Sequence, residues 1–145
     1  MSYLASKPSL TLALARQAVQ AAQEYAEASH LRVCLWVVNA QGLPVHFAHL
    51  DGAPFLSQNI ALNKALTAAN FGRSTAEWDE RLRHCSPGVQ AGLPLQAGMA
   101  LFGGGLPFVY REEVIGAIGV SGASEAQDIA CAAAAVKRVE QLLDC

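Results

Sequence analysis

Two pairs of strand-like segments, each joined by a short connection, limit the possible folds more than any other feature of the sequence. Residues 31–38 and 43–50 are separated by Asn39-Ala40-Gln41-Gly42, and residues 106–110 and 114–120 by a turn near Arg111. Connections this short join antiparallel strands. In the first strand both alternating sets of side chains are apolar, which is typical of a strand covered on both faces. The sequence therefore predicts an antiparallel sheet between two layers.

Segments with helical spacing separate these hairpins and supply the layers. Four are predicted: residues 11–29, 57–71, 75–83 and a last helix that opens at Ser124. Ser9 is the expected N-cap of the first and Ser57 of the second, Gly72 ends the second, and Ser124 forms a capping box with Gln127. A further short strand is expected at residues 99–102. The order predicts one α+β domain over residues 1–145, with a sheet of about five strands and helices on its faces.

The charge content predicts an oligomer. Only 15% of the 145 residues are charged, against about 25% in an average protein, and residues 86–110 contain no charged side chain. That segment is long enough to cross a bilayer, but its prolines and glycines would break a helix repeatedly. It is therefore interpreted as a buried or interfacial region of loops and strands, with no membrane partner.

Charge and cysteine content also limit the expected partners and cellular compartment of the protein. The net charge of −2 includes no basic patch, so nucleic acid is not an expected partner. Residues 1–7 lack the basic and apolar regions of a signal peptide, which favours a cytoplasmic protein. Four cysteines, at 34, 85, 131 and 145, have no CxxC spacing and are expected to be reduced and mostly structural.

Three segments resemble one known family. Residues 61–71, Ala-Leu-Asn-Lys-Ala-Leu-Thr-Ala-Ala-Asn-Phe, resemble the Lys-Ala-x-Thr-Ala helix of the GlcG/HbpS haem-binding-protein-like family, which includes the C-terminal domain of PduO-type corrinoid adenosyltransferases. Residues 104–107 are similar to its Gly-Gly-x-Pro signature, and residues 114–122 to its closing strand. The resemblance covers nearly the whole chain. It implies a five-stranded antiparallel sheet between helices, profilin-like or roadblock-like in appearance, that assembles into oligomers.

The resemblance implies function less specifically than fold. Some members bind haem, and others are associated with corrinoid or glycolate metabolism. Many relatives carry Arg-x-Asp-Gly-Ala after the second strand, where this chain has His49-Leu50-Asp51-Gly52-Ala53, and many have an Asp at the position of Asn39. An imidazole in place of a permanent cation weakens the case for anion binding at this position.

Five residues are the candidate ligand-binding site: His49, Asp51, Lys64, Gly104 and Gly105. Lys64 has no acid within four residues, so its ammonium reaches solvent, meets a ligand carboxylate, or pairs with Asp51 or Asp128. A haem needs only one axial ligand, and His49 is the first choice because it ends a strand beside Asp51. The glycines either meet a close neighbour or a strained backbone, or leave room for a ligand.

No catalytic arrangement or metal-binding cluster is evident from residue order, so whether the chain is an enzyme stays open. His46 and His49 lie on opposite faces of one strand and cannot share a metal. The sequence therefore predicts a protein that binds a small molecule, with haem or another tetrapyrrole first. The alternatives are an accessory protein or enzyme of hydroxy-acid or aromatic catabolism, with Lys64 and Asp51 handling a carboxylated metabolite, and a purely structural oligomer.

Overall fold

A computed structural model describes residues 2–144 of the protein. Its elements, in chain order, are α1 (Leu12–Ala28), β1 (Cys34–Asn39), β2 (Pro44–His49), α2 (Ser57–Phe71), the 3-10 helix η1 (Thr75–Glu77), α3 (Trp78–Arg83), α4 (Pro87–Gly92), the 3-10 helix η2 (Leu93–Leu95), β3 (Gly105–Tyr110), β4 (Glu113–Ser121) and α5 (Glu125–Leu142). None of the helices in this part of the chain has the length and apolar character that a bilayer crossing requires.

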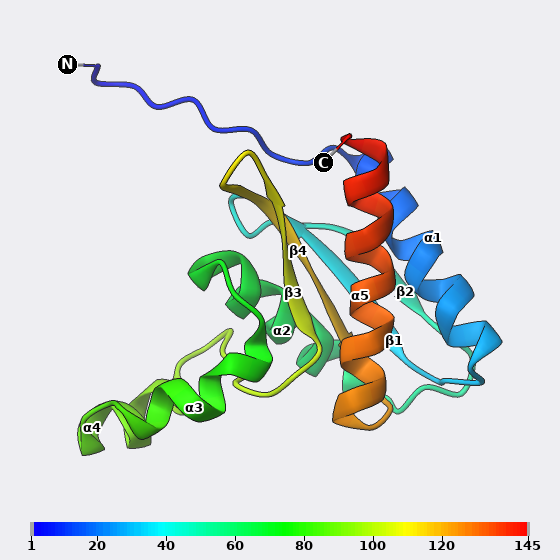
Figure 1. The fold of residues 1–145 in the computed structure, drawn as a ribbon. Helices are drawn as coiled ribbons and strands as arrows, with labels where there is room; N and C mark the ends of the chain where they lie inside the picture. Colours follow the sequence, from blue (N-terminus) through cyan, green and yellow to red (C-terminus); the bar gives the residue numbers. More distant parts are fainter. Residues whose placement is uncertain (1, 145) are drawn as a thin grey trace.

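The strands form one antiparallel sheet in the order β2-β1-β4-β3. α2 packs on one face, and α1 and α5 pack side by side on the other (Figure 1). The α+β prediction is confirmed, but residues 2–144 form four strands where about five were predicted. Residues 99–102 are not a strand, because the Ala100 N–H donates to Thr67 Oγ1 of α2 at 3.0 Å and so does not pair with an edge of the sheet.

Local signals fixed most of the element ends. The Ser124–Gln127 capping box is present, and Gly72 ends α2 in the left-handed conformation, with φ of 65°. Two cap predictions are wrong. Thr11 caps α1, while the Ser9 hydroxyl accepts a hydrogen bond from the Ala40 N–H at 3.0 Å. Ser57 is the first residue of α2 and not its cap.

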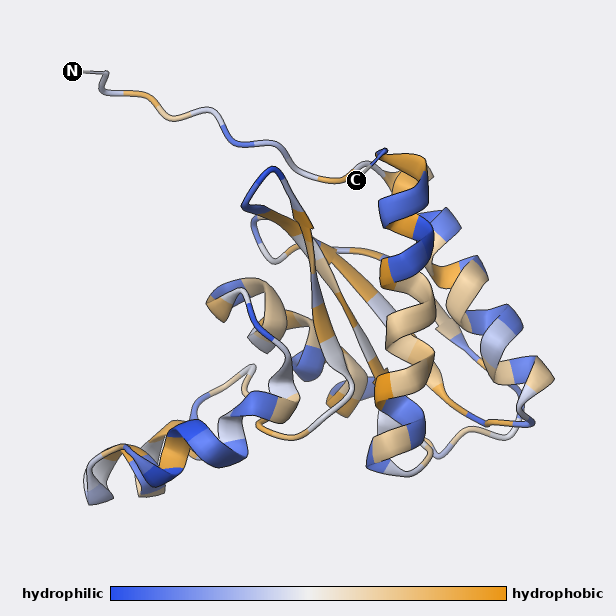
Figure 2. Ribbon diagram, in the orientation of Figure 1, coloured by the Kyte–Doolittle hydropathy of each residue, from blue (hydrophilic) through white to orange (hydrophobic). Residues whose placement is uncertain are grey.

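The face under α1 and α5 holds the larger core. Leu35, Val37, Phe108, Ile118 and Val120 of the sheet are buried there against alanines of the two helices. Figure 2 shows the apolar residues along the strands and in the middle of α5. This face is closed by side chains that fill the space between helix and sheet.

The face under α2 is built from small residues. Ala65 and Ala68 of α2 pack on Val38 and Ala117. A Cβ added to Gly119 would overlap the carbonyl oxygen of Ala61, so the helix backbone lies almost directly on the strand. The helix in contact at Gly119 is therefore α2, and not the alanine-rich α5.

Residues 78–97, here called the arm, project from the body of the protein (Figure 1). The arm contains α3, α4 and η2. The two short helices α4 and η2 lie within residues 86–110 and were not predicted. Two threonines hold its base: Thr75 Oγ1 accepts from the Gly105 N–H at 2.9 Å, and Thr67 Oγ1 donates to the Gly98 carbonyl at 2.9 Å. No residue of α4 or η2 is buried.

Candidate functional site

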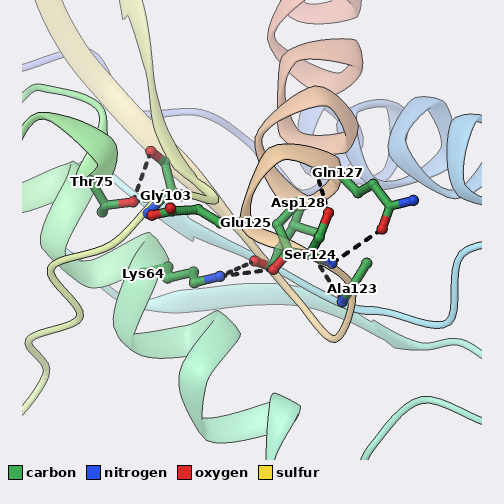
Figure 3. Close-up of polar contacts among 10 residues, drawn as sticks. Lys64, Thr75, Gly103, Ala123, Ser124, Glu125, Gln127 and Asp128 are labelled. Atoms are coloured by element: carbon green, nitrogen blue, oxygen red, sulfur yellow. Dashed lines mark hydrogen bonds and ion pairs between the residues drawn. The ribbon is translucent and has the colours of Figure 1, made fainter.

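Lys64 lies on the face of α2 that packs against the sheet, and its side chain is only 1% exposed. Its ammonium donates to the Val120 carbonyl at 2.8 Å and to the Asp128 carboxylate at 3.1 Å (Figure 3). The ring of Phe102 lies 4.9 Å from Nζ. Of the alternatives that the sequence left open for Lys64, the structure contains the ion pair with Asp128.

Asp128 is fixed at the start of α5. Its second carboxylate oxygen accepts a hydrogen bond from the Ala123 N–H at 3.1 Å. Burial lowers the pKa of Lys64, and the Asp128 carboxylate opposes that shift. Burial likewise raises the pKa of Asp128, against the attraction of Lys64. The pair therefore ties α2, β4 and α5 together, and each charge depends on the other.

The glycines after Phe102 allow the chain to pass over this pair. Gly104 has φ of +128°, and a Cβ there would lie 2.5 Å from the Val120 oxygen and 2.7 Å from Lys64 Nζ. A Cβ on Gly105 would overlap the Lys64 carbonyl. The Gly103 N–H donates to the Glu125 carboxylate at 2.6 Å. Glycine is therefore required at 104 and 105 because other groups of the same chain occupy the Cβ positions, and at 104 also because L side chains rarely adopt its positive φ.

His49 ends β2, the edge strand, and its side chain is exposed. Its Nδ1 lies 2.9 Å from Cys34 Sγ and 3.2 Å from Gln58 Nε2. Both contacts use Nδ1, so neither occupies Nε2. The ring of Phe47 lies 6.5 Å from the imidazole, on the same strand. The imidazole is thus oriented through one nitrogen by a neighbouring strand and by the first turn of α2.

A cavity of about 390 Å³ lies beside this strand end on the side of α1, because Gln23 and Glu27 of α1 line it together with His49 and Asp51. Lys64, Gly104 and Gly105 are not among its lining residues. The candidate residues therefore form two groups. Both groups lie at one end of the sheet, because Cys34 pairs with His49 on one side and with Ser121, the residue after Val120, on the other.

Three residues near His49 or Asp51 were not identified from the sequence: Cys34, Gln58 and Arg32. A turn at residues 39–42 alone would place residue 34 opposite residue 47, and the irregularity between Val37 and Val38 shifts the register so that Cys34 faces His49. Arg32 lies against the Asp51–Gly52 turn, with its Cδ 3.0 Å from the position a Gly52 Cβ would take. Its guanidinium is a cation beside Gly52, and hairpin register alone would not reveal this contact.

Three of the four cysteines lie within the described residues. Cys34, Cys85 and Cys131 are free thiols, and Cys145 lies outside the described residues. Burial raises the pKa of Cys34 and raises that of Cys131 to about 12. Within residues 2–144 no group of three or more His, Cys, Asp or Glu side chains could hold a metal ion.

Residues 10–137 match the model of a family described as haem degrading protein HbpS-like. The chain belongs to the HbpS-like family. The sequence is also 37% identical over 122 residues to an uncharacterized 15.0 kDa protein encoded in the dhaT–dhaS intergenic region of Citrobacter freundii. That alignment covers 82% of this chain and 84% of the relative.

Solved structures of similar proteins share the fold of this HbpS-like chain. The Klebsiella pneumoniae protein ORFY has a TM-score of 0.89 and 33% identity, with 97% of each chain covered. HbpS has a TM-score of 0.85 and 32% identity, with 93% of each chain covered. A PduOC complex with haem has a TM-score of 0.81 and 29% identity, covering 90% of this chain and 94% of the other. The resemblance inferred from the sequence motifs is thereby confirmed.

Proposed function

We propose that this HbpS-like protein binds haem or a related tetrapyrrole, with His49 as the axial ligand. The observation that carries the proposal is the exposed imidazole whose contacts to Cys34 and Gln58 both use Nδ1. A histidine that ligates a metal typically has its other ring nitrogen held by a hydrogen bond. The family description and the haem complex of PduOC support the same ligand class.

The surroundings of His49 suit such a ligand. Ligation through Nε2 requires a proton on Nδ1, which then donates to Cys34 Sγ or, with the amide turned over, to Gln58 Oε1. Phe55 and Leu56 are exposed in the turn just before Gln58 and offer apolar surface to a ring. Arg32, beside the next turn, offers a cation to a propionate. When bound, haem would supply an iron that can accept a further ligand or an electron.

Lys64, Gly104 and Gly105 take a structural role in this proposal, and Asp51 belongs with His49. A ligand carboxylate at Lys64 would have to displace Asp128 and leave that carboxylate buried without a cation, which is costly. The same cost disfavours the alternative in which Lys64 binds a carboxylated metabolite. The proposed ligand position is therefore the exposed end of β2, on the side of α2, where Gln58 contacts His49.

Titration with haemin, followed by visible absorption, tests the proposal. The parent protein should shift the Soret band and saturate, and His49→Ala should weaken binding at least tenfold. His46→Ala is the matched control, because His46 lies on the same strand but on its opposite face. It should bind as the parent does. Added imidazole should restore the parent spectrum to His49→Ala, because it replaces the missing ligand.

Two outcomes contradict the proposal. If the parent does not shift the Soret band, haem is not its ligand. If His49→Ala binds as the parent does, the axial ligand is another group. Gln58→Ala should weaken binding by about 10–100-fold, the usual effect of removing a group that orients a ligating histidine, and should alter the spectrum of the bound form.

A further inference from the structure

A cavity of about 510 Å³ lies where the start of α1, the end of α5 and the β3–β4 hairpin meet. These three elements lie at the same end of the molecule (Figure 1). Leu10 and Ile115 line the cavity, and the Leu10 N–H donates to the Ile115 carbonyl at 3.0 Å. Asn39, the last residue of β1, pairs with Gly116 beside this cavity, whereas His49 pairs with the first residue of β1. The cavity is therefore at the other end of the sheet from the proposed haem ligand.

The wall of this cavity is apolar and carries no charge. Leucines of α1 and of the end of α5 contribute to it, namely Leu14, Leu142 and Leu143, and none of the described residues that line it is charged. Its volume is in the range of about 300–1,000 Å³ that is typical of small-molecule sites. A charged ligand group would lose its water here without meeting an opposite charge, which is costly. An uncharged occupant is therefore favoured.

Two hydroxyl groups of the lining already accept hydrogen bonds from the chain itself. Ser9 Oγ accepts from the Ala40 N–H at 3.0 Å, and Thr11 Oγ1 accepts from the Leu14 N–H at 3.2 Å. A hydroxyl that accepts in this way still has its own proton to donate. Both groups therefore offer a donor to a molecule in the cavity.

The amide of Gln17, which also lines the cavity, is oriented in the same sense. Arg138 donates to Gln17 Oε1 from Nε at 3.4 Å and from Nη2 at 3.1 Å. Because a guanidinium has no acceptor, the carbonyl side of the amide must face it, and the NH₂ group is turned away. None of the hydrogen bonds among residues 2–144 uses that NH₂ group. Tyr110, the remaining polar residue of the lining, has a hydroxyl that can donate or accept.

We infer that this cavity binds an uncharged apolar molecule whose polar group is an acceptor oxygen, such as an alkyl ketone or ester. The leucines and Ile115 contact the alkyl part, and the absence of charge in the lining selects a neutral molecule. Ser9, Thr11 and Gln17 supply donors to the oxygen. The site does not depend on haem binding at His49, because the two positions lie at opposite ends of β1.

Displacement of the apolar fluorophore N-phenyl-1-naphthylamine by 2-alkanones tests the site. Along the series 2-hexanone, 2-heptanone and 2-octanone, affinity should rise about fourfold for each added methylene, the factor expected when one methylene is buried. 2-Octanone should bind about tenfold or more tightly than octanoate or octylammonium, because their charges would be desolvated without a partner. Octylammonium is disfavoured further because it brings only donors to a wall of donors.

Two variants and one control locate the site. Ala13→Phe should fill the cavity from the exposed first turn of α1 and lose measurable binding of 2-octanone. Ala133→Phe is the matched control, because Ala133 is likewise exposed on a helix but does not line this cavity. Gln17→Glu keeps an acceptor for Arg138 and removes the N–H donors. It should weaken 2-octanone about fivefold, the effect of one hydrogen bond, and strengthen octylammonium. Unchanged circular dichroism in each variant verifies folding.

Several results would overturn the inference. These are a parent that does not bind 2-alkanones, affinities independent of chain length, octylammonium binding more tightly than 2-octanone, and parental binding by Ala13→Phe. Saturating 2-octanone should leave the haemin affinity unchanged, and competition between the two would show a shared site and overturn it as well. A chain without residues 2–7 should bind 2-octanone as the parent does. A large gain in affinity would show that this segment, in which Leu4 is 87% exposed, is the occupant instead.

Discussion

The two faces of the sheet differ in the groups that contact their helices. Under α1 and α5, branched and aromatic side chains such as Leu35, Phe108 and Ile118 fill the space. Under α2, the sheet offers Gly119 and Ala117, and the helix backbone itself comes into contact. The first face tolerates small changes of volume, because side chains can rearrange. The second does not, because the groups in contact are main-chain atoms.

The faces also differ in what they leave at the surface. On the face with two helices the core residues belong to one cluster, and cavities lie near the two ends of α1. The single helix on the other face leaves His49 exposed and carries the buried Lys64 at the same end of the sheet. The buried Lys64 and the contact between His49 and Gln58 therefore both lie on the side of α2.

The largest effect should come from one added methyl group at the α2 contact. Gly119→Ala would press a Cβ against the Ala61 carbonyl, so we expect it to lose more than about 3 kcal/mol of folding free energy, the upper end of overpacking. Gly92→Ala is the control, since nothing lies within 4 Å of its Cβ position. Urea denaturation measures both. Equal stability of the two variants would show that α2 does not rest on the strand backbone.

The buried ion pair should give the next largest effect. Lys64→Met leaves Asp128 buried without its cation and should cost about 3–5 kcal/mol. The double variant Lys64→Met/Asp128→Asn should be more stable than Lys64→Met, because the amide keeps an oxygen for the Ala123 N–H. Urea denaturation of the three proteins at one pH provides the measurement.

The stability of Lys64→Met as a function of pH provides a second test of the ion pair. Burial raises the pKa of Asp128, and removal of Lys64 removes the main opposing charge. A carboxyl group whose folded pKa lies above its unfolded pKa stabilises the fold at low pH, and this contribution is lost as the pH rises through the folded pKa. The variant should therefore gain stability relative to the parent as the pH falls. A constant difference between them would contradict the ion pair.

Cys131 on the other face should give a smaller effect, seen only at high pH. Burial raises its pKa to about 12 from 9.0, so above pH 9 the unfolded chain loses a thiol proton that the folded chain keeps. Stability should then fall with a slope of up to about 1.4 kcal/mol per pH unit from this group. Chemical denaturation of the parent and of Cys131→Ala between pH 8 and 10.5 isolates the contribution of this thiol to stability. Parallel curves would show that Cys131 is accessible to water when folded.

Local patterns predicted most of this fold. Short connections specified both hairpins, and Gly72 and the Ser124–Gln127 box specified helix ends, because each signal acts within a few residues. Residues 99–102 were misjudged as a strand because their hydrogen-bond partner, Thr67, is distant in sequence. The short α4 went unpredicted although Ser86-Pro87 is a typical helix start.

Less of the candidate site could be predicted from the sequence, because its contacts join residues that are distant along the chain. The need of Lys64 for a partner follows from its apolar surroundings. The choice of Asp128, 64 residues along the chain, depends on how the start of α5, which covers the opposite face of the sheet, follows the end of β4. The division of the five candidate residues into two groups is likewise a result of tertiary packing. The pairing of Cys34 with His49 was also out of reach, because the irregularity between Val37 and Val38 shifts the register that the turn alone would give.

Hydrogen–deuterium exchange with and without haemin tests most directly the claim that the exposed end of β2, on the α2 side, binds the ligand. If the ligand binds there, we expect slower exchange in residues 48–60, which contain the end of β2 and the start of α2. The larger cavity of about 510 Å³, lined by Pro8, Leu14, Tyr110 and Leu142 among others, should show no change. Protection at that apolar cavity, with residues 48–60 unaffected, would contradict the account.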